Sequence, residues 1–422
     1  MTLKAVKIIN GRIITPDRII EGGSILVSGD TIAAINDPGF SGPKPDTTPG
    51  MGPNSAVHPG TPAIRVIDAK GMYISPGFID IHVHGGGGFD FMDGHATAFL
   101  TIAETHARYG TTAMLPTTLT SSKQDLLHTL DTYATAHAVN SKGAQFLGMH
   151  LEGPYFAMNQ RGAQDARYIR NPDPAEYMEI LDYSKDIKRW SAAPELPGAI
   201  DFARYARQKG VLVSMAHTDA TYEEALEGFN NGYSLATHLY SGMSGVTRRN
   251  GFRYAGVIEA AFLIDEMDVE IITDGIHLPA PLLRLVYKIK GPDRTALITD
   301  AMRAAGMPPG DSILGNINNG LKVVVEDGVA KLPDRSAFAG SVATADRLVR
   351  NMVRMAGVPL EQAVNMITRT PATILGLHDK KGALAPGMDA DLVIFDEDIQ
   401  IQMTMIKGNI VYAGNNIKGG GL

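Results

Sequence analysis

Two histidines separated by one residue stand at the end of an apolar run, and both side chains can bind a divalent metal ion. The run is Phe78-Ile79-Asp80-Ile81-His82-Val83-His84, and glycines fill positions 85–88 after it. Because strand side chains alternate between two faces, we expect His82 and His84 to point the same way, about 7 Å apart. The glycines are expected to allow a tight turn and to leave open space beside the imidazoles. Neutral imidazoles at one open spot suit a metal, but for this motif alone surface or hydrogen-bonded histidines are an equally good interpretation.

Further polar groups stand where other predicted strands end. With His150 set aside, these groups are Glu152 after the third strand, His217 after the fifth, His238 after the sixth and Asp300 after the eighth. In a parallel barrel the ends of the strands share one mouth. A single histidine in such a place is more often a capping or solvated group, and Asp300 is also compatible with a helix N-cap. The recurrence at equivalent places favours a shared catalytic metal site.

The residue types point to hydrolysis of an amide or deamination of a ring. The chain has no cysteine, so any metal must be held by histidines and carboxylates. A metal in such a site lowers the pKa of bound water and polarises a carbonyl. A nearby carboxylate that is not a ligand can take the proton of the water and return it to a leaving amine. The sequence has no phosphate-binding loop and no nucleophile elbow, which disfavours phosphoryl transfer and serine hydrolysis.

Composition limits the partners. With 44% hydrophobic and 20% charged residues, the chain has the composition of a globular protein. A net charge of −7 and the lack of a basic block disfavour nucleic acid as a partner. No stretch approaches the roughly 20 apolar residues of a membrane span, and the first residues lack a signal-peptide core. We therefore expect a cytoplasmic protein without a membrane partner.

The strands and helices that must position these groups predict an α/β fold, specifically a (β/α)8 TIM barrel. A chain of 422 residues predicts either two domains or a large barrel with a smaller module. Strands are expected at Phe78–Val83, Thr112–Pro116, Phe146–Leu151, Lys188–Ala192, Val211–Ala216, Ser234–Thr237, Val269–Thr273 and Ala296–Thr299, alternating with helical stretches such as Ala96–Tyr109, Lys123–Asn140, Ala199–Lys209, Tyr222–Asn230 and Pro281–Lys290. A doubly wound sheet is the alternative, but no Gly-x-Gly-x-x-Gly opens a helix after the first strand.

Both chain ends carry short strands, which predicts one small β-sandwich domain built from the two ends. Expected strands are Val6–Ile14, Ser24–Ser28, Thr31–Ile35 and Ile64–Asp68 near the start, and Asp391–Phe395, Ile401–Ile406 and Ile410–Tyr412 near the end. The domain boundaries are placed at residues 1–74, 75–376 for the barrel, and 377–422. Residues 38–62 are rich in proline and glycine and read as an irregular surface loop. Helices are also expected at Val342–Ala356 and Glu361–Thr368.

Several of these motifs resemble a known family. Residues 75–85 and 382–393 are similar to segments of the amidohydrolase superfamily. Within it, the chain resembles the N-acetylglucosamine-6-phosphate deacetylase family through His150-Leu151-Glu152-Gly153-Pro154-Tyr155, Ala193-Pro194-Glu195, Thr237-His238-Leu239-Tyr240, Thr273-Asp274-Gly275-Ile276-His277 and Thr299-Asp300-Ala301-Met302. The motifs stand in the family's order and span nearly the whole chain.

The resemblance implies a site, a reaction and an assembly. Glu152, His217 and His238 correspond to the principal metal site, and His82 and His84 to a second position bridged by Glu152, so one or two ions, zinc or Fe(II), are expected per subunit. Asp300 corresponds to the catalytic acid/base in removal of the acetyl group from N-acetyl-D-glucosamine 6-phosphate. Substrate contacts fall on Ala163, Gln164, Ser241, Gly242, Asp274, Gly275, Ile276, His277, Phe338, Ala339 and Gly340. Arg249 corresponds to a phosphate-binding arginine contributed across a homodimer interface.

The chain departs from the family pattern beside the expected sugar contacts. Family members usually carry histidine where Gln164 stands, and Asn-Ala where Ser241-Gly242 stands. These changes leave the metal ligands in place but alter hydrogen-bond donors around the sugar. The departures therefore leave open another N-acetylated amino-sugar phosphate, such as N-acetylgalactosamine 6-phosphate. Two further alternatives are an enzyme of the superfamily that acts on a cyclic amide or amino-substituted heterocycle, and a non-catalytic scaffold. The presence of all five predicted metal ligands and of Asp300 argues against the scaffold.

Overall fold

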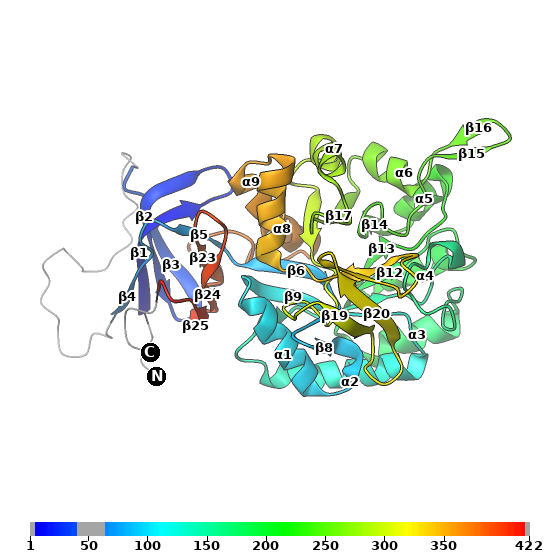
Figure 1. Ribbon diagram of the computed structural model, residues 1–422, viewed down its shortest axis with the longest axis horizontal. Coiled ribbons are helices and arrows are strands. Elements are labelled where there is room, and N and C mark those ends of the chain that lie inside the picture. Colours follow the sequence, from blue (N-terminus) through cyan, green and yellow to red (C-terminus); the bar gives the residue numbers. More distant parts are fainter. Residues whose placement is uncertain (1–4, 40–63, 418–422) are drawn as a thin grey trace, which may run out of the picture.

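The computed structural model describes residues 5–39 and 64–417, which form a barrel and a small β domain (Figure 1). The barrel strands pair in parallel in the order β6 (Phe78–Val83), β9 (Thr111–Thr118), β11 (Met149–Glu152), β12 (Ile187–Ala192), β13 (Leu212–Met215), β14 (Tyr233–Ala236), β17 (Asp268–Ile272) and β18 (Thr295–Ile298), with the short β10 (Gln145–Phe146) beside β9. Each strand expected from the sequence is present. The fold is therefore the predicted barrel and not a doubly wound sheet.

Helices alternate with the strands and cover the outside of the barrel (Figure 1). They are α1 (Ala96–Ala107), α2 (Lys123–Val139), α3 (Pro174–Tyr183), α4 (Ala199–Gln208), α5 (Tyr222–Asn230), α6 (Val257–Leu263), α7 (Ala280–Lys290), α8 (Ala345–Asn351), α9 (Leu360–Asn365) and α10 (Arg369–Ile374), and a π-helical turn, Met352–Ala356, extends α8. Local signals define their ends: α5 begins at Thr221, which exchanges hydrogen bonds with Glu224 in a capping box. The apolar face of α1, including Phe99 and Ile102, is fully buried.

The first and last barrel strands, β6 and β18, lie side by side but form no regular backbone ladder with each other in the described residues. Away from the mouth, both strands bond instead to the segment between α9 and α10. The N–H of Ile79 donates to the carbonyl of Ile367 over 2.8 Å, and the N–H of Leu297 donates to the carbonyl of Met366 over 2.9 Å. At the mouth, the N–H of Asp300 donates to the carbonyl of His82 over 2.9 Å. The segment between α9 and α10 therefore bridges β6 and β18 away from the mouth. At the mouth, the predicted site residues His82 and Asp300 close the barrel.

The two chain ends build the small β domain, as expected. Its sheet contains β1 (Ala5–Ile14), β2 (Ile19–Ser28), β3 (Thr31–Asn36), β4 (Ile64–Asp68), β5 (Tyr73–Pro76), β23 (Leu392–Phe395), β24 (Ile401–Ile406) and β25 (Asn409–Ala413). The antiparallel pair β5–β23 joins the two ends. Most of the proline- and glycine-rich segment lies outside the described residues, and the boundaries at residues 74 and 377 stay predictions. In the described ranges, no helix has the length and apolarity needed to cross a membrane.

Two additions to the barrel are not among the elements expected from the sequence. A four-stranded antiparallel sheet, β19 (Gly310–Leu314), β20 (Leu321–Glu326), β21 (Val329–Lys331) and β22 (Phe338–Ser341), follows β18. Ser341 of β22 donates its N–H to the carbonyl of Asp300 over 2.8 Å, which fixes this sheet at the barrel mouth. A hairpin, β15 (Thr247–Arg249) and β16 (Phe252–Tyr254), projects from the barrel beyond α5 and α6 (Figure 1).

Candidate active site

The predicted metal and catalytic side chains converge at the barrel mouth. Their ligand atoms form two groups, each within 4.8 Å: His82, His84 and Asp300, and Glu152, His217 and His238. Glu152 connects the groups, because its Oε1 lies 3.1 Å from His238 Nε2 and 3.4 Å from His82 Nε2, and its Oε2 lies 3.4 Å from His84 Nε2. All six residues are buried. The sequence therefore predicted correctly which side chains the fold brings together.

Backbone turns at the strand ends aim three of these side chains into the mouth. His217, His238 and Asp300 have φ values of 46°, 32° and 46°, in the left-handed region that non-glycine residues seldom adopt. Such conformations cost about 1–3 kcal/mol each and persist where the surrounding structure enforces them, most often at functional sites. The helix-cap alternative for Asp300 is wrong, because residues 301–306 form a bridge and turns rather than a helix.

Backbone carbonyls orient two of the imidazoles. His217 Nδ1 donates to the carbonyl of Gln160 over 2.8 Å, and His84 Nδ1 donates to the carbonyl of Thr117 over 3.3 Å. In the neutral form of both residues the lone pair is therefore on Nε2, which faces the cluster. This arrangement is typical of metal-binding histidines, whose second nitrogen is held by a hydrogen bond.

The charges of the cluster shift its ionisation. Burial alone would lower the pKa of His82 and His84, but the carboxylates of Glu152 and Asp300 raise these values to about 9 and about 10. Burial alone would raise the pKa of Glu152, yet the charge of His82 holds it well below its ordinary value. The pKa of His238 is lowered by burial. The carboxylates thus create a negative field in which positive charge is stabilised.

A network of fully buried polar side chains adjoins the cluster inside the barrel. Arg189 pairs with Glu270 and also donates to Thr237 Oγ1 over 2.8 Å. Glu270 Oε2 lies 3.7 Å from His82 Nδ1, which has no hydrogen-bond partner among the described residues. The His150 ring packs edge-on to His82, with centroids 4.7 Å apart. This network could not be predicted, because Arg189 and Glu270 lie inside strands with no motif around them.

The glycines after His84 do not leave open space, contrary to expectation. The N–H groups of Gly85, Gly87 and Gly88 donate to the carbonyls of Ala301, Ala305 and Arg303 at 2.8 Å each. A side chain at Gly85 would bring its Cβ within 2.8 Å of the Arg303 nitrogen. Gly85 is required because the loop there packs backbone to backbone against the segment that follows Asp300.

A pocket of about 320 Å³ opens above the cluster. Of the substrate contacts predicted from the family resemblance, Ala163, Gln164, Ser241, Gly242, His277, Phe338 and Gly340 line it. Leu119, Gly162, Tyr240, Leu314 and Ala337 also line it, although they are not among the predicted substrate contacts. Three of these immediately precede a predicted contact in the sequence, but Leu119 and Leu314 come from segments without a motif.

The other predicted contacts lie outside this pocket lining. Asp274 is buried and fixes His277: its Oδ2 accepts from His277 Nδ1 over 2.7 Å. Gly275 and Ile276 form the turn between these two residues, and Ala339 is a fully buried residue of β22 itself. Arg249 lies on the exposed hairpin, with its guanidinium 5.4 Å from the Tyr254 ring centroid.

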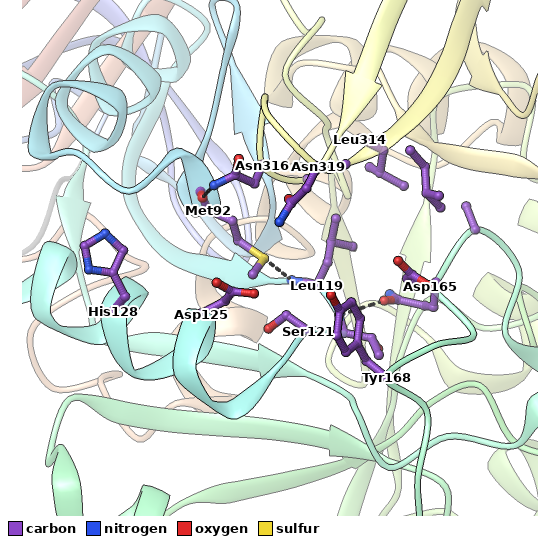
Figure 2. Close-up of a pocket in the computed structure, with 16 residues that line it drawn as sticks. Met92, Leu119, Ser121, Asp125, His128, Asp165, Tyr168, Leu314, Asn316 and Asn319 are labelled. Atoms are coloured by element: carbon purple, nitrogen blue, oxygen red, sulfur yellow. Dashed lines mark hydrogen bonds between the residues drawn. The ribbon is translucent and has the colours of Figure 1, made fainter.

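A smaller pocket adjoins the first (Figure 2). Leu119, Ala163, Gln164 and Leu314 line both pockets. In Figure 2, Leu119 lies near the centre of this second pocket, and its N–H donates to the sulfur of Met92 over 3.1 Å. The shared residues therefore form the wall between the two spaces.

The donor set fits a divalent ion on chemical grounds. It offers imidazole nitrogens and carboxylate oxygens with no thiolate, it is buried, and it opens into a pocket that can admit water and substrate. Structural metal sites are closed by four protein ligands, whereas catalytic sites keep a position open. The barrel and this donor set together define a metal-dependent amide hydrolase.

Comparison with known proteins agrees with this class. The chain belongs to the amidohydrolase family, whose model matches residues 73–411, and within it to the N-acetylglucosamine-6-phosphate deacetylase family. A relative named N-acetylglucosamine-6-phosphate deacetylase from Lysinibacillus sphaericus is 36% identical over 86% of this chain and 91% of its own length. N-acetylgalactosamine-6-phosphate deacetylase from Escherichia coli O157:H7 is 34% identical over 82% of this chain and 90% of its own.

Solved structures give the same result. The N-acetylglucosamine-6-phosphate deacetylase of Pasteurella multocida superposes with a TM-score of 0.84 at 28% identity, covering 96% of this chain and 99% of the other. A mutant of the Mycobacterium smegmatis enzyme in complex with N-acetyl-D-glucosamine-6-phosphate superposes with a TM-score of 0.83 at 28% identity, covering 98% and 100%.

Proposed function

We propose that the protein removes the acetyl group from N-acetyl-D-glucosamine 6-phosphate, giving glucosamine 6-phosphate and acetate. The observation that carries this proposal is the convergence of two groups of three metal-ligating side chains, joined through Glu152, at the floor of a pocket of about 320 Å³. The 36% identity to a relative named N-acetylglucosamine-6-phosphate deacetylase supports deacetylation of a phosphorylated amino sugar.

Glu152, His217 and His238 would hold the principal ion, and His82 and His84 would complete a second position. Zinc or Fe(II) suits imidazole and carboxylate ligands. When bound, such an ion supplies activated water and polarises the acetyl carbonyl.

Asp300 would act as the acid/base. It accepts a proton from the attacking water and then donates that proton to the sugar nitrogen as the amide bond breaks. Its Oδ1 lies 3.1 Å from His84 Nε2 and 3.6 Å from His82 Nε2, so the carboxylate stands beside the predicted second ion position and at the pocket floor. His277, fixed by Asp274, would orient the sugar from the pocket wall.

Arg249 would bind the phosphate of a substrate held by the other subunit of a homodimer. Arg249 and its hairpin neighbours Arg248, Phe252 and Arg253 are exposed in the isolated chain. A guanidinium binds phosphate through charge-assisted, often bidentate hydrogen bonds. A cytoplasmic location, as expected from the sequence, completes the proposal.

A second candidate substrate is N-acetylgalactosamine 6-phosphate. The observation that favours it is the set of departures from the family pattern, Gln164, Ser241 and Gly242, all of which line the pocket. Identities of 36% and 34% to relatives named for the two sugars do not separate the candidates.

Acetate release from matched substrates tests the proposal. The panel contains the 6-phosphates of N-acetylglucosamine, N-acetylgalactosamine and N-acetylmannosamine, the same sugars without phosphate, and a cyclic amide. We expect the highest kcat/KM for N-acetylglucosamine 6-phosphate. A higher value for the galactosamine derivative would establish the second candidate, and activity on the cyclic amide alone would overturn both.

A further inference from the structure

Gln164 touches a predicted metal ligand directly. Its Nε2 donates to Glu152 Oε2 over 2.6 Å, and its Oε1 accepts the N–H of Thr120 over 2.9 Å. The side chain is buried, with 7% of the residue exposed. Because a backbone N–H can only donate, the contact with Thr120 fixes the carbonyl end of the amide, and the NH₂ group must face Glu152.

Gln164 and His84 both approach Glu152 Oε2, the latter at 3.4 Å, and the other carboxylate oxygen faces the histidines of the principal ligand group. Glu152 Oε1 lies 3.1 Å from His238 Nε2 and 3.5 Å from His217 Nε2. A charge-assisted hydrogen bond on Oε2 restricts rotation of the carboxylate about its last bond. The direction in which Oε1 points into the ligand group is therefore set by the amide of Gln164.

The segment that carries Gln164 is also bound to a second ligand, His217. The N–H of Ala157 donates to the His217 carbonyl over 2.8 Å, and the Gln160 carbonyl accepts from His217 Nδ1 over 2.8 Å. Residues 157–164 therefore contact two of the three side chains in the principal ligand group. The short 3-10 helix Met158–Gln160 at its centre keeps these contacts close together.

We propose that Gln164 is a positioning residue for the metal ligand Glu152, rather than a contact to the sugar. The inference rests on the proposed metal site and concerns this chain's own departure from its family pattern. Gln164 acts through a neutral amide that holds one carboxylate oxygen and leaves the other directed at His217 and His238. Loss of such an outer hydrogen bond typically weakens metal affinity about 10- to 100-fold.

Zinc binding to the metal-free protein tests the proposal without requiring turnover. In Gln164→Leu the side chain keeps its approximate volume and still separates the two pockets, but both hydrogen bonds are lost. We expect its affinity for zinc, measured by competition with a chromophoric chelator, to fall about 10-fold or more. In the zinc-saturated variant, kcat for acetate release should fall while KM stays close to the wild-type value. The visible spectrum of the cobalt-substituted variant should also differ from that of wild type.

Ser241→Ala is the matched control, because Ser241 lines the same pocket but belongs to another loop. Its zinc affinity should equal that of wild type. The thermal unfolding midpoint of each metal-free variant shows whether it folds, and if Gln164→Leu does not, Gln164→Asn provides the same test with an amide too short to span both partners. Unchanged zinc affinity in the folded Gln164 variant, or an equal loss in Ser241→Ala, would overturn the proposal. Failure of wild type to bind zinc or to release acetate would instead refute the proposed function.

Discussion

The N–H of Asp300 donates to the carbonyl of His82 over 2.9 Å, so the predicted acid/base is fixed by its backbone to a predicted metal ligand where the barrel closes. The carboxylate of Asp300 makes a separate approach, 3.1 Å from His84 Nε2. The backbone of Asp300 therefore closes the barrel, and its side chain stays available for the proposed proton transfer.

Replacing Asp300 by asparagine should abolish most turnover without unfolding the protein. The backbone bond to His82 remains, but an amide cannot accept and return a proton, and loss of a general acid/base typically costs about 10²- to 10⁴-fold. We expect kcat for acetate release to fall by that factor while zinc content, measured by mass spectrometry, remains near wild type. Near-normal turnover in this variant would show that another group carries the proton.

The proposed role of Arg249 can be tested by mixing subunits. Arg249→Ala should raise KM for the phosphorylated sugar about 10- to 100-fold, the equivalent of a lost hydrogen bond to a charged group, and should hardly affect an unphosphorylated substrate. If Arg249 acts across the interface, dimers mixed from Arg249→Ala and Asp300→Asn chains contain one complete site. Random mixing would then restore about a quarter of the wild-type activity. No recovery in verified mixed dimers would place Arg249 in its own subunit's site or outside the mechanism.

His82 and His84 should determine how many ions are bound. Replacing both by asparagine is expected to lower the metal content by about one ion per subunit, because Glu152, His217 and His238 remain as a three-ligand site. Part of the hydrolytic activity should persist. The comparison variant His238→Asn should lose the principal ion and the activity with it. Unchanged metal content in the double variant would show that the two histidines hold no ion.

Gly242 should be required because a side chain there would collide with His217, and not only because of its backbone conformation. Gly242 has φ +56°, and a Cβ there would lie 2.8 Å from His217 Nδ1 and 2.9 Å from the Gln160 carbonyl. Gly242→Ala is expected to lower the free energy of unfolding by about 1–3 kcal/mol and to weaken zinc binding. Gly210→Ala is the control, because Gly210 has φ +77° but a Cβ there would have no atom within 4 Å. Equal zinc affinity in the two variants would contradict the account.

The sequence predicted the barrel, the small β domain and the cluster for a shared physical reason. Buried parallel strands are continuous apolar runs, and polar residues that interrupt them at their ends, such as His217 and His238, are conspicuous. The residues that support the cluster cannot be recognised in the sequence in this way. Arg189 and Glu270 lie within strands, and the Gln160 carbonyl belongs to the backbone, so no residue type marks it. The sheet β19–β22 was also missed, because short antiparallel strands after the last barrel strand have no fixed relation to the barrel repeat.

Metal-dependent release of acetate from N-acetyl-D-glucosamine 6-phosphate can be measured directly. One protein sample is assayed as purified, after treatment with a chelator, and after metal is added back. By proton NMR, the protein as purified should give acetate and glucosamine 6-phosphate in equal amounts. The chelator-treated sample should give neither, and adding zinc or Fe(II) should restore both. Absence of acetate from every phosphorylated N-acetylhexosamine after metal loading would contradict the account.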